Sequence, residues 1–365
     1  MDTPHDLEPM KQRIVVAMSG GVDSSVAAAR MQDQGFEVVG LTLHLWETTD
    51  PDVQSRCCAP EDVREAQRVA DQLGFPHYSF DRIDQFDREI VEPFVNAYLS
   101  GNTPSPCAAC NQIIKFPTLL RFASLIGANA VATGHYAQTI QTPSGIRVAR
   151  GLDGLKDQSY FLSTLDARAL QMLKLPLGRD TKDNVRIEAI KRKIVGSGKG
   201  ESQDLCFVPS GSYARFVEQR APDRVKPGWV VDKSGRRLGS HGGVHKFTLG
   251  QRKGLGIAIG KPVFVTAIDA DRGLVIVEDS MQNRVSGVVI GEPRVAAGVE
   301  FPVSATLQVR YRDTGTRAML ERDADGSVRA VFNEPVRAAC PGQLAVGYVG
   351  EEVVVGGTIS RVVGL

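Results

Sequence analysis

Apolar and polar positions alternate in two different patterns along the N-terminal part of the chain. Short apolar runs predict buried strands, and they occupy residues 14–17, 36–45, 77–80 and 130–133. Between them, apolar residues recur at helical spacing, which predicts helices over 60–73, 84–99 and 111–126. Strands that alternate with helices favour an α/β fold, with a doubly wound, mainly parallel sheet that binds ligands at the carboxyl ends of its strands.

The pattern changes after residue 137. Segments 138–141 and 146–150 flank a Thr-Pro-Ser-Gly turn and predict a hairpin. Segment 174–199 holds eight Lys or Arg against three Asp or Glu, and we interpret it either as a solvated helix face or as a phosphate-backbone patch. Beyond a short helix near 212–219, β-branched residues recur in short runs, one of them at 246–248. They predict a small central β-rich domain and a C-terminal β-barrel.

The chain has 365 residues, which is long for one domain. We expect a catalytic domain with the basic segment at 10–207, a central domain at 208–281 and the barrel at 282–365. The formal net charge of +1 does not by itself indicate a nucleic-acid partner. No apolar run approaches the roughly 20 residues of a membrane span, and the polar N-terminus is unlike a signal peptide. We therefore expect a cytoplasmic protein without a membrane partner.

The first predicted strand runs into Ser19-Gly20-Gly21-Val22-Asp23-Ser24-Ser25. Two glycines let the backbone turn tightly and approach a ligand. The free N–H groups of the helix that follows form an anion site. A Walker A loop has a Lys-Ser/Thr pair after its last glycine, whereas Val22 and Asp23 stand there in this chain. The string instead resembles the PP-loop of the N-type ATP pyrophosphatases, which cleave ATP between the α and β phosphates.

Six cysteines are too few for a disulfide scaffold. Cys107 and Cys110 form a C-x-x-C in a Pro- and Gly-rich loop just before a predicted helix, where the helix dipole is expected to lower a thiol pKa. A C-x-x-C alone is typical of redox sites, of metal sites or of no function. Cys206 lies far downstream, and with the other two it forms an alternative set of ligands for a [4Fe-4S] cluster. Cys57, Cys58 and Cys340 are interpreted as small packed hydrophobes.

Six motifs follow one another in a fixed order: SGGVDSS, TPSPCAACNQIIKF, ATGHY, KDQSYFL, GESQDLCF and RYR. This ordered set resembles the tRNA-specific 2-thiouridylases (the MnmA family) of the PP-loop superfamily. The resemblance implies a tRNA-uridine 2-sulfurtransferase that replaces the C2 oxygen of the wobble uridine with sulfur. ATP adenylates that oxygen, with Mg²⁺ on the triphosphate and Asp23 helping to place it, and sulfur arrives as a cysteine persulfide.

The resemblance also assigns residues. Cys110 is the nucleophile and Cys206 carries the persulfide, and the two form a disulfide once per turnover. The implied ATP contacts are Ala17, Met18, Ser19, Gly20, Gly21, Val22, Asp23, Ser24, Leu43 and Gly134. The implied base and tRNA contacts are Ser105, Pro106, Cys107, Lys156, Asp157, Gln158, Arg310 and Tyr311. Many relatives have Asn-Pro-Asp where this chain has Ser-Pro-Cys, which puts the side-chain contacts to the uracil in question.

The implied partners are tRNA and a persulfide-donating sulfur carrier or cysteine desulfurase, and we expect a monomer. His135 is interpreted either as polar lining of the site or as a packed histidine. One alternative function is another PP-loop ligase or amidotransferase that releases AMP and pyrophosphate, but such an enzyme does not need Cys110 and Cys206. Another is a non-catalytic RNA-binding protein, against which the intact loop argues.

Overall fold

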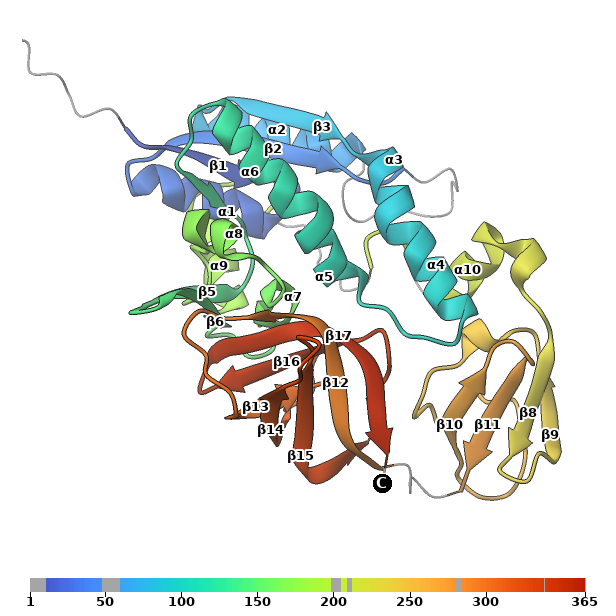
Figure 1. Cartoon of the computed structure of the whole chain (residues 1–365). Helices are drawn as coiled ribbons and strands as arrows, with labels where there is room; N and C mark the ends of the chain where they lie inside the picture. Colours follow the sequence, from blue (N-terminus) through green and yellow to red (C-terminus); the bar gives the residue numbers. More distant parts are fainter. Residues whose placement is uncertain are drawn as a thin grey trace, which may run out of the picture.

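The structure is a computed structural model that describes residues 11–47, 60–197, 205–208, 212–279, 284–337 and 339–364. Cys57 and Cys58 lie outside these ranges. The described chain forms an α/β unit, a small β unit and a barrel, which are visible as three bodies in Figure 1. No helix in the described ranges is long and apolar enough to span a bilayer.

The α/β unit is built on a parallel sheet of order β3-β2-β1-β4-β7. Its strands are β1 (Arg13–Ala17), β2 (Glu37–His44), β3 (His77–Asp81), β4 (Ala130–Ala132) and β7 (Leu173–Lys174). Every neighbouring pair in this sheet is parallel. The predicted doubly wound α/β fold is therefore confirmed.

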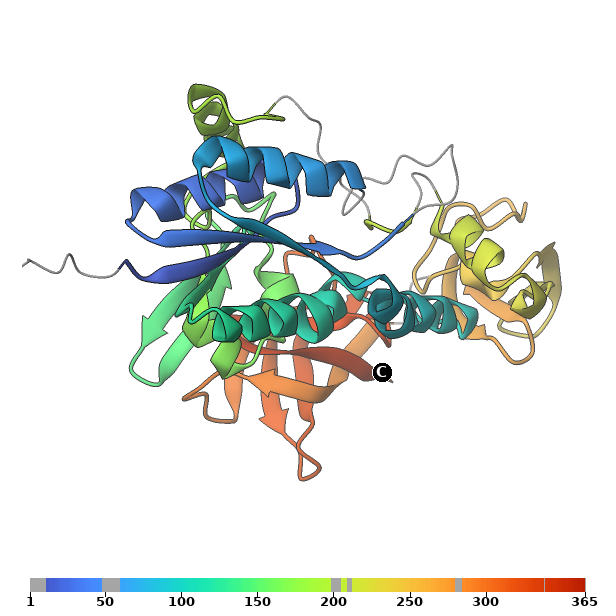
Figure 2. The same ribbon diagram turned by 90° about the horizontal axis from the view of Figure 1, so that it is seen from above.

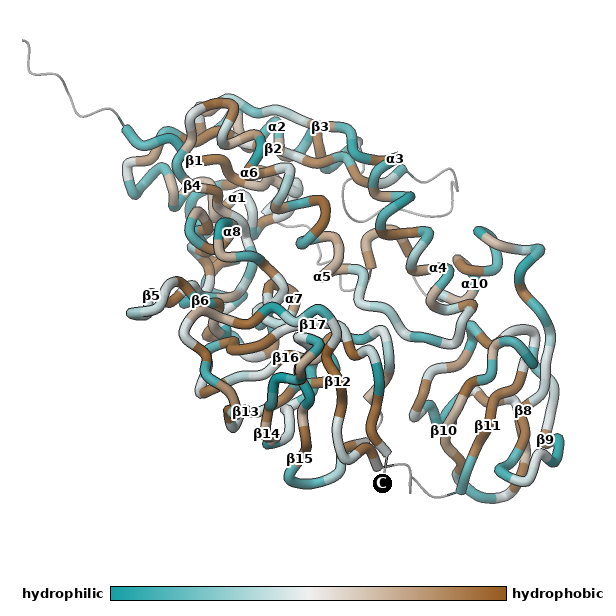
Figure 3. Tube along the Cα trace, in the orientation of Figure 1, coloured by the Kyte–Doolittle hydropathy of each residue, from teal (hydrophilic) through white to brown (hydrophobic). Residues whose placement is uncertain are grey.

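Alternate residues of the central strand β1 face opposite layers of helices, because side chains in a strand alternate between its faces. Ile14 and Val16 pack with α1 (Val22–Asp33) and α2 (Pro60–Leu73), while Val15 packs with α6 (Phe116–Leu125). Figure 2 shows α1 and α2 on one side of the sheet and α6 on the other. Apolar segments are concentrated in the strands of all three sheets (Figure 3).

Two long helical segments each contain a π-helical turn. One consists of α3 (Ile83–Phe86), η1 (Asp87–Val91) and α4 (Glu92–Leu99), and the other of α5 (Pro106–Cys110), η2 (Asn111–Lys115) and α6. The second segment starts at Pro106, five positions before the predicted start at 111, because proline suits the first position of a helix. The C-x-x-C therefore lies in the first turns of this helix, and its prediction as a loop is wrong.

The hairpin is confirmed as β5 (Ala137–Thr142) and β6 (Gly145–Arg150), and it joins the barrel sheet where β6 pairs with β17 (Glu352–Gly364). It is followed by α7 (Ser159–Leu162), α8 (Ala167–Met172) and α9 (Lys182–Lys191). The ion pairs of Arg30 with Asp180 at 2.6 Å and with Glu188 at 2.5 Å hold α9 against α1. Part of the basic segment is thus folded onto the helix that starts at the PP-loop.

The small β unit follows α10 (Tyr213–Arg220) and has the strand order β10-β11-β8-β9. Its strands are β8 (Gly228–Asp232), β9 (Arg237–His241), β10 (Phe264–Asp269) and β11 (Leu274–Glu278). The predicted strand at 246–248 is wrong, because Val244–Lys246 forms a 3₁₀ turn that places Phe247 in the core of this unit.

The barrel consists of β12 (Arg284–Val295), β13 (Val303–Gln308), β14 (Thr316–Arg322), β15 (Val328–Arg337), β16 (Leu344–Val349) and β17. The order is β12-β15-β14-β13-β16-β17, and antiparallel pairing of β12 with β17 closes the ring. The predicted C-terminal barrel is therefore confirmed.

Candidate active site

The PP-loop connects the end of β1 to the start of α1 and is held in shape by its own serines. Ser24 Oγ accepts the Ser19 N–H at 3.1 Å and donates to the Gly21 carbonyl at 3.0 Å. Ser25 Oγ donates to the same carbonyl at 2.9 Å. Gly20 has φ +71°, and a Cβ on it would lie 2.5 Å from the backbone oxygen of Asp62. Only glycine fits this position without displacing α2.

Gly134 follows strand β4 and touches the start of α1. A Cβ on Gly134 would lie 2.8 Å from Ser24 N and 2.9 Å from the carbonyl carbon of Asp23. The structure thus places the predicted contact Gly134 directly against the PP-loop. The remaining predicted ATP contacts lie at the loop or in the sheet beneath it: Ala17 at the end of β1, Met18 buried, Val22 at the start of α1, and Leu43 buried in β2.

Asp23 has two side-chain partners that sequence reasoning missed. Lys182 Nζ lies 2.7 Å from each Asp23 carboxylate oxygen, and Tyr136 Oη donates to Oδ1 at 2.8 Å. Lys182 is only 8% exposed. The basic character of segment 174–199 was the available signal, but a partner 159 positions away leaves no local pattern around Asp23.

His135 lies between the PP-loop and the helical segment 106–125, which carries Cys107 and Cys110 and is called the cysteine helix below. Its Nδ1 is 2.8 Å from Thr133 Oγ1, and its ring stacks on Phe116 with centroids 6.4 Å apart. Burial, with a further contribution from the positive charge of Lys115, lowers the pKa of His135 to about 3. His135 is therefore a neutral, packed histidine, as the second of its two interpretations predicted.

Cys110 is 4% exposed and belongs to the main hydrophobic cluster of the α/β unit. Burial raises the pKa of its thiol, although the positive charge of Lys115 acts in the opposite direction. The expected lowering of a thiol pKa at this helix start is wrong for Cys110, because desolvation of the thiolate outweighs the helix dipole. The thiol is kept in its neutral, less reactive form.

Cys206 lies on the short described segment 205–208 and packs against the same hydrophobic cluster that contains Cys110. Its neighbour Phe207 is buried among Phe86 and Phe94, with ring centroids 5.6 Å and 5.0 Å away. The fold therefore brings a segment close to the C-terminal end of the α/β unit into the same apolar core as Cys110. The pairing of Cys110 with Cys206 stays a prediction.

Cys107 is half-buried, three positions before Cys110. Among the residues that the structure describes, no group of three or more Cys, His, Asp or Glu side chains is arranged to hold a metal ion. The role of Cys107, Cys110 and Cys206 as ligands of the alternative [4Fe-4S] cluster stays a prediction. Ser105 and Pro106 begin the same helix, so the predicted base-contact segment lies in the turn before Cys110, the predicted nucleophile.

The segment Lys156-Asp157-Gln158 is bound to the PP-loop through Tyr136. The Gln158 N–H donates to the Tyr136 carbonyl at 2.8 Å, and Gln158 Oε1 accepts from the Tyr136 N–H at 3.0 Å. Asp157 is buried, and its carboxylate accepts from Arg150 at 3.1 Å and from Ser159 Oγ at 2.9 Å. These internal bonds occupy the Asp157 side chain.

Arg310 and Tyr311 reach the same region from the barrel. The Tyr311 ring lies on Phe161 with centroids 4.4 Å apart, next to the segment that carries Gln158. Arg310 Nη2 donates to the carbonyl of Leu249 at 3.1 Å and contacts Cys340 Sγ at 3.5 Å. Arg310 therefore links the barrel to the central domain, and the buried Cys340 packs as expected.

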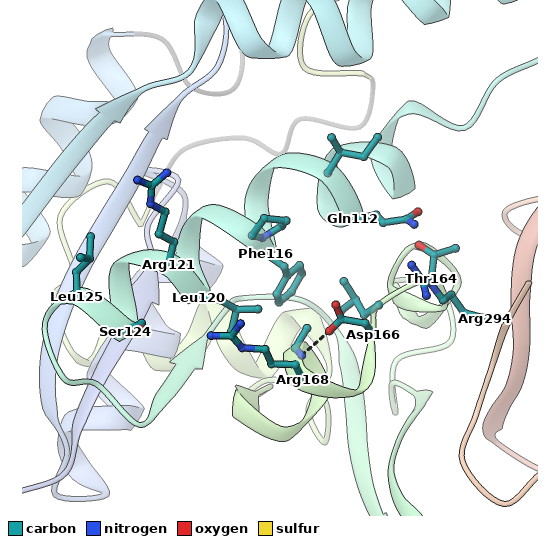
Figure 4. A pocket seen from close by; sticks show the side chains of 14 residues that line it. Gln112, Phe116, Leu120, Arg121, Ser124, Leu125, Thr164, Asp166, Arg168 and Arg294 are labelled. Carbon is teal, nitrogen blue, oxygen red and sulfur yellow. Dashed lines mark hydrogen bonds between the residues drawn. The ribbon is translucent and has the colours of Figure 1, made fainter. Parts of the chain in front are cut away.

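A cavity of about 560 Å³ follows α6, the helix that continues from Cys110 (Figure 4). Arg121 of α6, Arg168 of α8 and Arg294 of β12 line it, together with apolar side chains such as Phe116 and Leu120. Sequence reasoning missed this cavity, because its arginines come from three distant parts of the chain. Arginines on an exposed groove are typical of contacts to phosphate groups.

Three family models match successive parts of the chain. Their descriptions are tRNA methyl transferase HUP domain over residues 12–210, tRNA methyl transferase PRC-barrel domain over 214–279, and Aminomethyltransferase beta-barrel domain over 288–359. The three models follow the order of the parallel sheet, the four-stranded sheet and the barrel.

Curated relatives align over almost the whole chain. The tRNA-specific 2-thiouridylase MnmA of Sorangium cellulosum is 51% identical over 95% of this chain and 92% of that protein. The proteins of the same name from Moorella thermoacetica and Carboxydothermus hydrogenoformans are 44% and 41% identical, over 95% and 96% of this chain and 99% and 98% of theirs. A solved 4-thiouridine synthetase–RNA complex with bound ATP matches with a TM-score of 0.35 and 18% identity, over 58% of this chain and 51% of that one, which is too weak to support an argument.

Two of the family-model descriptions name methyl transfer, whereas these full-length relatives are named 2-thiouridylases. Identity of 41–51% over nearly complete chains is the more specific of the two findings. The chain belongs to the tRNA-specific 2-thiouridylase (MnmA) family.

Proposed function

We propose that this protein catalyses the ATP-dependent 2-thiolation of the wobble uridine of tRNA. One observation carries the proposal: the PP-loop and the Cys110 helix meet at Gly134-His135. Gly134 lies against Asp23 and Ser24, and His135 stacks on Phe116 of the cysteine helix. The Lys115 charge acts on both side chains: it opposes the rise that burial causes in the Cys110 pKa and adds to the fall that burial causes in the His135 pKa. A site for phosphates and a thiol thus share one region.

The chemistry needs both parts, because the C2 oxygen of uracil is a poor leaving group. The uracil oxygen attacks the α-phosphate, the bond between the α and β phosphates breaks, and pyrophosphate leaves. The PP-loop N–H groups and the N-terminus of α1 stabilise the phosphate charge. AMP then becomes the leaving group at C2, and sulfur replaces it.

Oxidation of the two cysteines to a disulfide supplies the two electrons that the sulfur step needs. A persulfide on Cys206 presents its terminal sulfur, and the Cys110 thiolate attacks the inner sulfur. The two electrons of this attack leave the terminal sulfur as sulfide, which attacks C2, and a Cys110–Cys206 disulfide remains. An external reductant must restore the two thiols before the next turnover.

Asp23 is the carboxylate of the PP-loop and suits Mg²⁺, which proteins usually bind through one or two carboxylates and the substrate phosphates. When bound, Mg²⁺ neutralises part of the triphosphate charge. The cluster on Cys107, Cys110 and Cys206 stays an alternative, and no step is assigned to it. We further infer a monomeric, cytoplasmic enzyme that receives its sulfur from a persulfide carrier or a cysteine desulfurase.

Binding of tRNA is supported by the convergence of Gln158, Tyr311 and the arginine-lined cavity around the cysteine helix. The test is the release of AMP and pyrophosphate with and without unmodified tRNA. We expect release that depends on tRNA and equals the sulfur incorporated. Release that is independent of tRNA, with an amino acid or amide acceptor instead, would support the alternative PP-loop ligase.

A further inference from the structure

We propose that Lys182 is a catalytic residue that binds the β- and γ-phosphates of ATP and the pyrophosphate that leaves. The inference rests on the proposed adenylation step and adds a residue that comes from outside the PP-loop motif. It starts from one juxtaposition: an ammonium group of α9 lies 2.7 Å from both oxygens of Asp23, at the start of the phosphate-binding helix.

The burial of Lys182 requires an explanation, because lysines are almost never buried unless they are paired. Its side chain is about one-tenth exposed, and the Asp23 carboxylate provides the countercharge. The Tyr136 ring adds a second favourable neighbour, with its centroid 5.8 Å from Nζ. Asp23 remains one-third exposed, so the ion pair borders solvent at the start of α1.

The backbone of Lys182 is fixed by contacts that do not involve its side chain. Thr181 caps α9 by accepting the Asn184 N–H, and the Lys182 N–H donates to Asp153 Oδ2 at 3.0 Å. The ion pairs of Arg30 with Asp180 and Glu188 hold this helix on α1. The base of the side chain is thus held rigidly beside the PP-loop, while its four-carbon stem lets the ammonium group move between Asp23 and a bound phosphate.

Charge gives the reason for a lysine here. Residues 17–24 contain no cation, and their one charged side chain, Asp23, is negative. A Walker A loop carries its own lysine for the β- and γ-phosphates. A PP-loop that receives a triphosphate must take a cationic side chain from elsewhere, and α9 places one within hydrogen-bonding distance of the loop.

The role follows from the bond that breaks. When the uracil oxygen bonds to the α-phosphorus, the electron pair of the α–β bond moves to the bridging oxygen, which leaves on the β-phosphate. Negative charge therefore develops on pyrophosphate, and an ammonium group positioned there lowers the barrier. The Lys182 ammonium group moves from Asp23 to this oxygen without transferring a proton.

The first test measures binding of inorganic pyrophosphate and of AMP by calorimetry to wild type, Lys182→Met and Lys182→Arg. Lys191→Met is the matched control, because Lys191 is exposed in the last turn of the same helix. We expect Lys182→Met to weaken pyrophosphate binding by about ten- to hundredfold, as for a lost hydrogen bond to a charged group, with AMP binding unchanged. Lys182→Arg should retain part of the affinity. A loss no larger than that of Lys191→Met, in a folded variant, would overturn the proposal.

A second test uses the wild-type chain, so it does not depend on whether Lys182→Met folds. An ATP derivative with an acyl group on the γ-phosphate acylates lysines near the phosphates, and peptide mass spectrometry locates the product. Acylation of Lys182 that excess ATP suppresses supports the assignment, while acylation confined to other lysines contradicts it. Neither test uses tRNA or sulfur. Absence of thiolation would therefore defeat the proposed function alone, and thiolation with unchanged pyrophosphate binding in Lys182→Met would defeat this inference alone.

Discussion

The PP-loop and the cysteine helix lie next to each other but prepare their chemistry in opposite ways. The loop is polar, and its shape is fixed by hydrogen bonds of Ser24 and Ser25 to Gly21. The helix buries Cys110 in an apolar cluster and raises the pKa of its thiol. The loop is therefore rigid before any ligand binds, whereas the predicted nucleophile Cys110 is held neutral. We infer that its thiolate forms when substrates bind.

Replacing the nucleophile gives the largest expected effect. Cys110→Ser should reduce thiolation by about a thousandfold or more, because a hydroxyl group cannot form the disulfide with Cys206 that releases the sulfide. ATP binding should stay within about twofold of wild type, since Cys110 belongs to the other region. Equilibrium binding and tRNA nucleoside analysis measure the two effects. Cys340→Ser is the control for a buried cysteine outside the helix, and equal loss in both variants would argue against a special role for Cys110.

Gly20→Ala tests whether the close contact between the PP-loop and α2 shapes the ATP site. The new Cβ would meet the Asp62 backbone oxygen at 2.5 Å and impose φ +71° on alanine, so ATP binding should weaken by about tenfold or more. Gly35→Ala is a matched control, because Gly35 has φ +86° but nothing within 4 Å of the new Cβ. Similar ATP affinity in the two variants would show that crowding against α2 does not shape the loop.

The pH dependence of single-turnover thiolation tests the neutral thiol. Burial raises the pKa of Cys110, so the rate should increase with pH through the range above 7, by about tenfold per unit while the thiol is mostly protonated. Lys115→Met removes a charge that lowers this pKa, and should move the increase to higher pH. A profile that is already flat at pH 7 would contradict a raised pKa.

His135 provides the control for this profile. Because its pKa is lowered to about 3, it stays neutral across the measured range and contributes no inflection near its ordinary value of 6.5. His135→Asn should keep the shape of the profile. Loss of an inflection near 6.5 in that variant would show that His135 titrates in the active enzyme.

The smallest expected effect concerns the support beneath the loop. Arg30→Met removes the partly buried ion pairs that hold α9 on α1, and should lower the free energy of unfolding by about 1–3 kcal/mol. Lys261→Met removes an exposed pair with Asp279 and should cost less than about 1 kcal/mol. Denaturant titration compares the two, and equal losses would show that the α1–α9 contact is no stronger than a surface pair.

How far the sequence predicts these regions depends on how local each property is. The PP-loop and the helix over 60–73 could be predicted, since a glycine pair, a capping pattern and a 3.6-residue period are all contained in neighbouring residues. The α/β fold followed by a barrel was also predictable from the succession of such patterns. The start of the cysteine helix was misplaced, because the Pro106 that begins it was assigned to the preceding loop.

The properties that sequence reasoning missed depend on packing between distant segments. Lys182 meets Asp23 across 159 positions, and the cavity arginines come from three elements. The sign of the Cys110 pKa shift follows from burial, a tertiary property that opposes the local effect of the helix dipole. Local patterns therefore predict which groups react, but not the environment that controls them.

The central claim is tested most directly by digesting tRNA to nucleosides after incubation with the protein, ATP, Mg²⁺ and a persulfide donor. The proposed reaction predicts a uridine in which one sulfur has replaced one oxygen, formed only with ATP and absent with Cys206→Ser. Unchanged nucleosides, with a donor shown to be active and a protein that binds ATP, would contradict it.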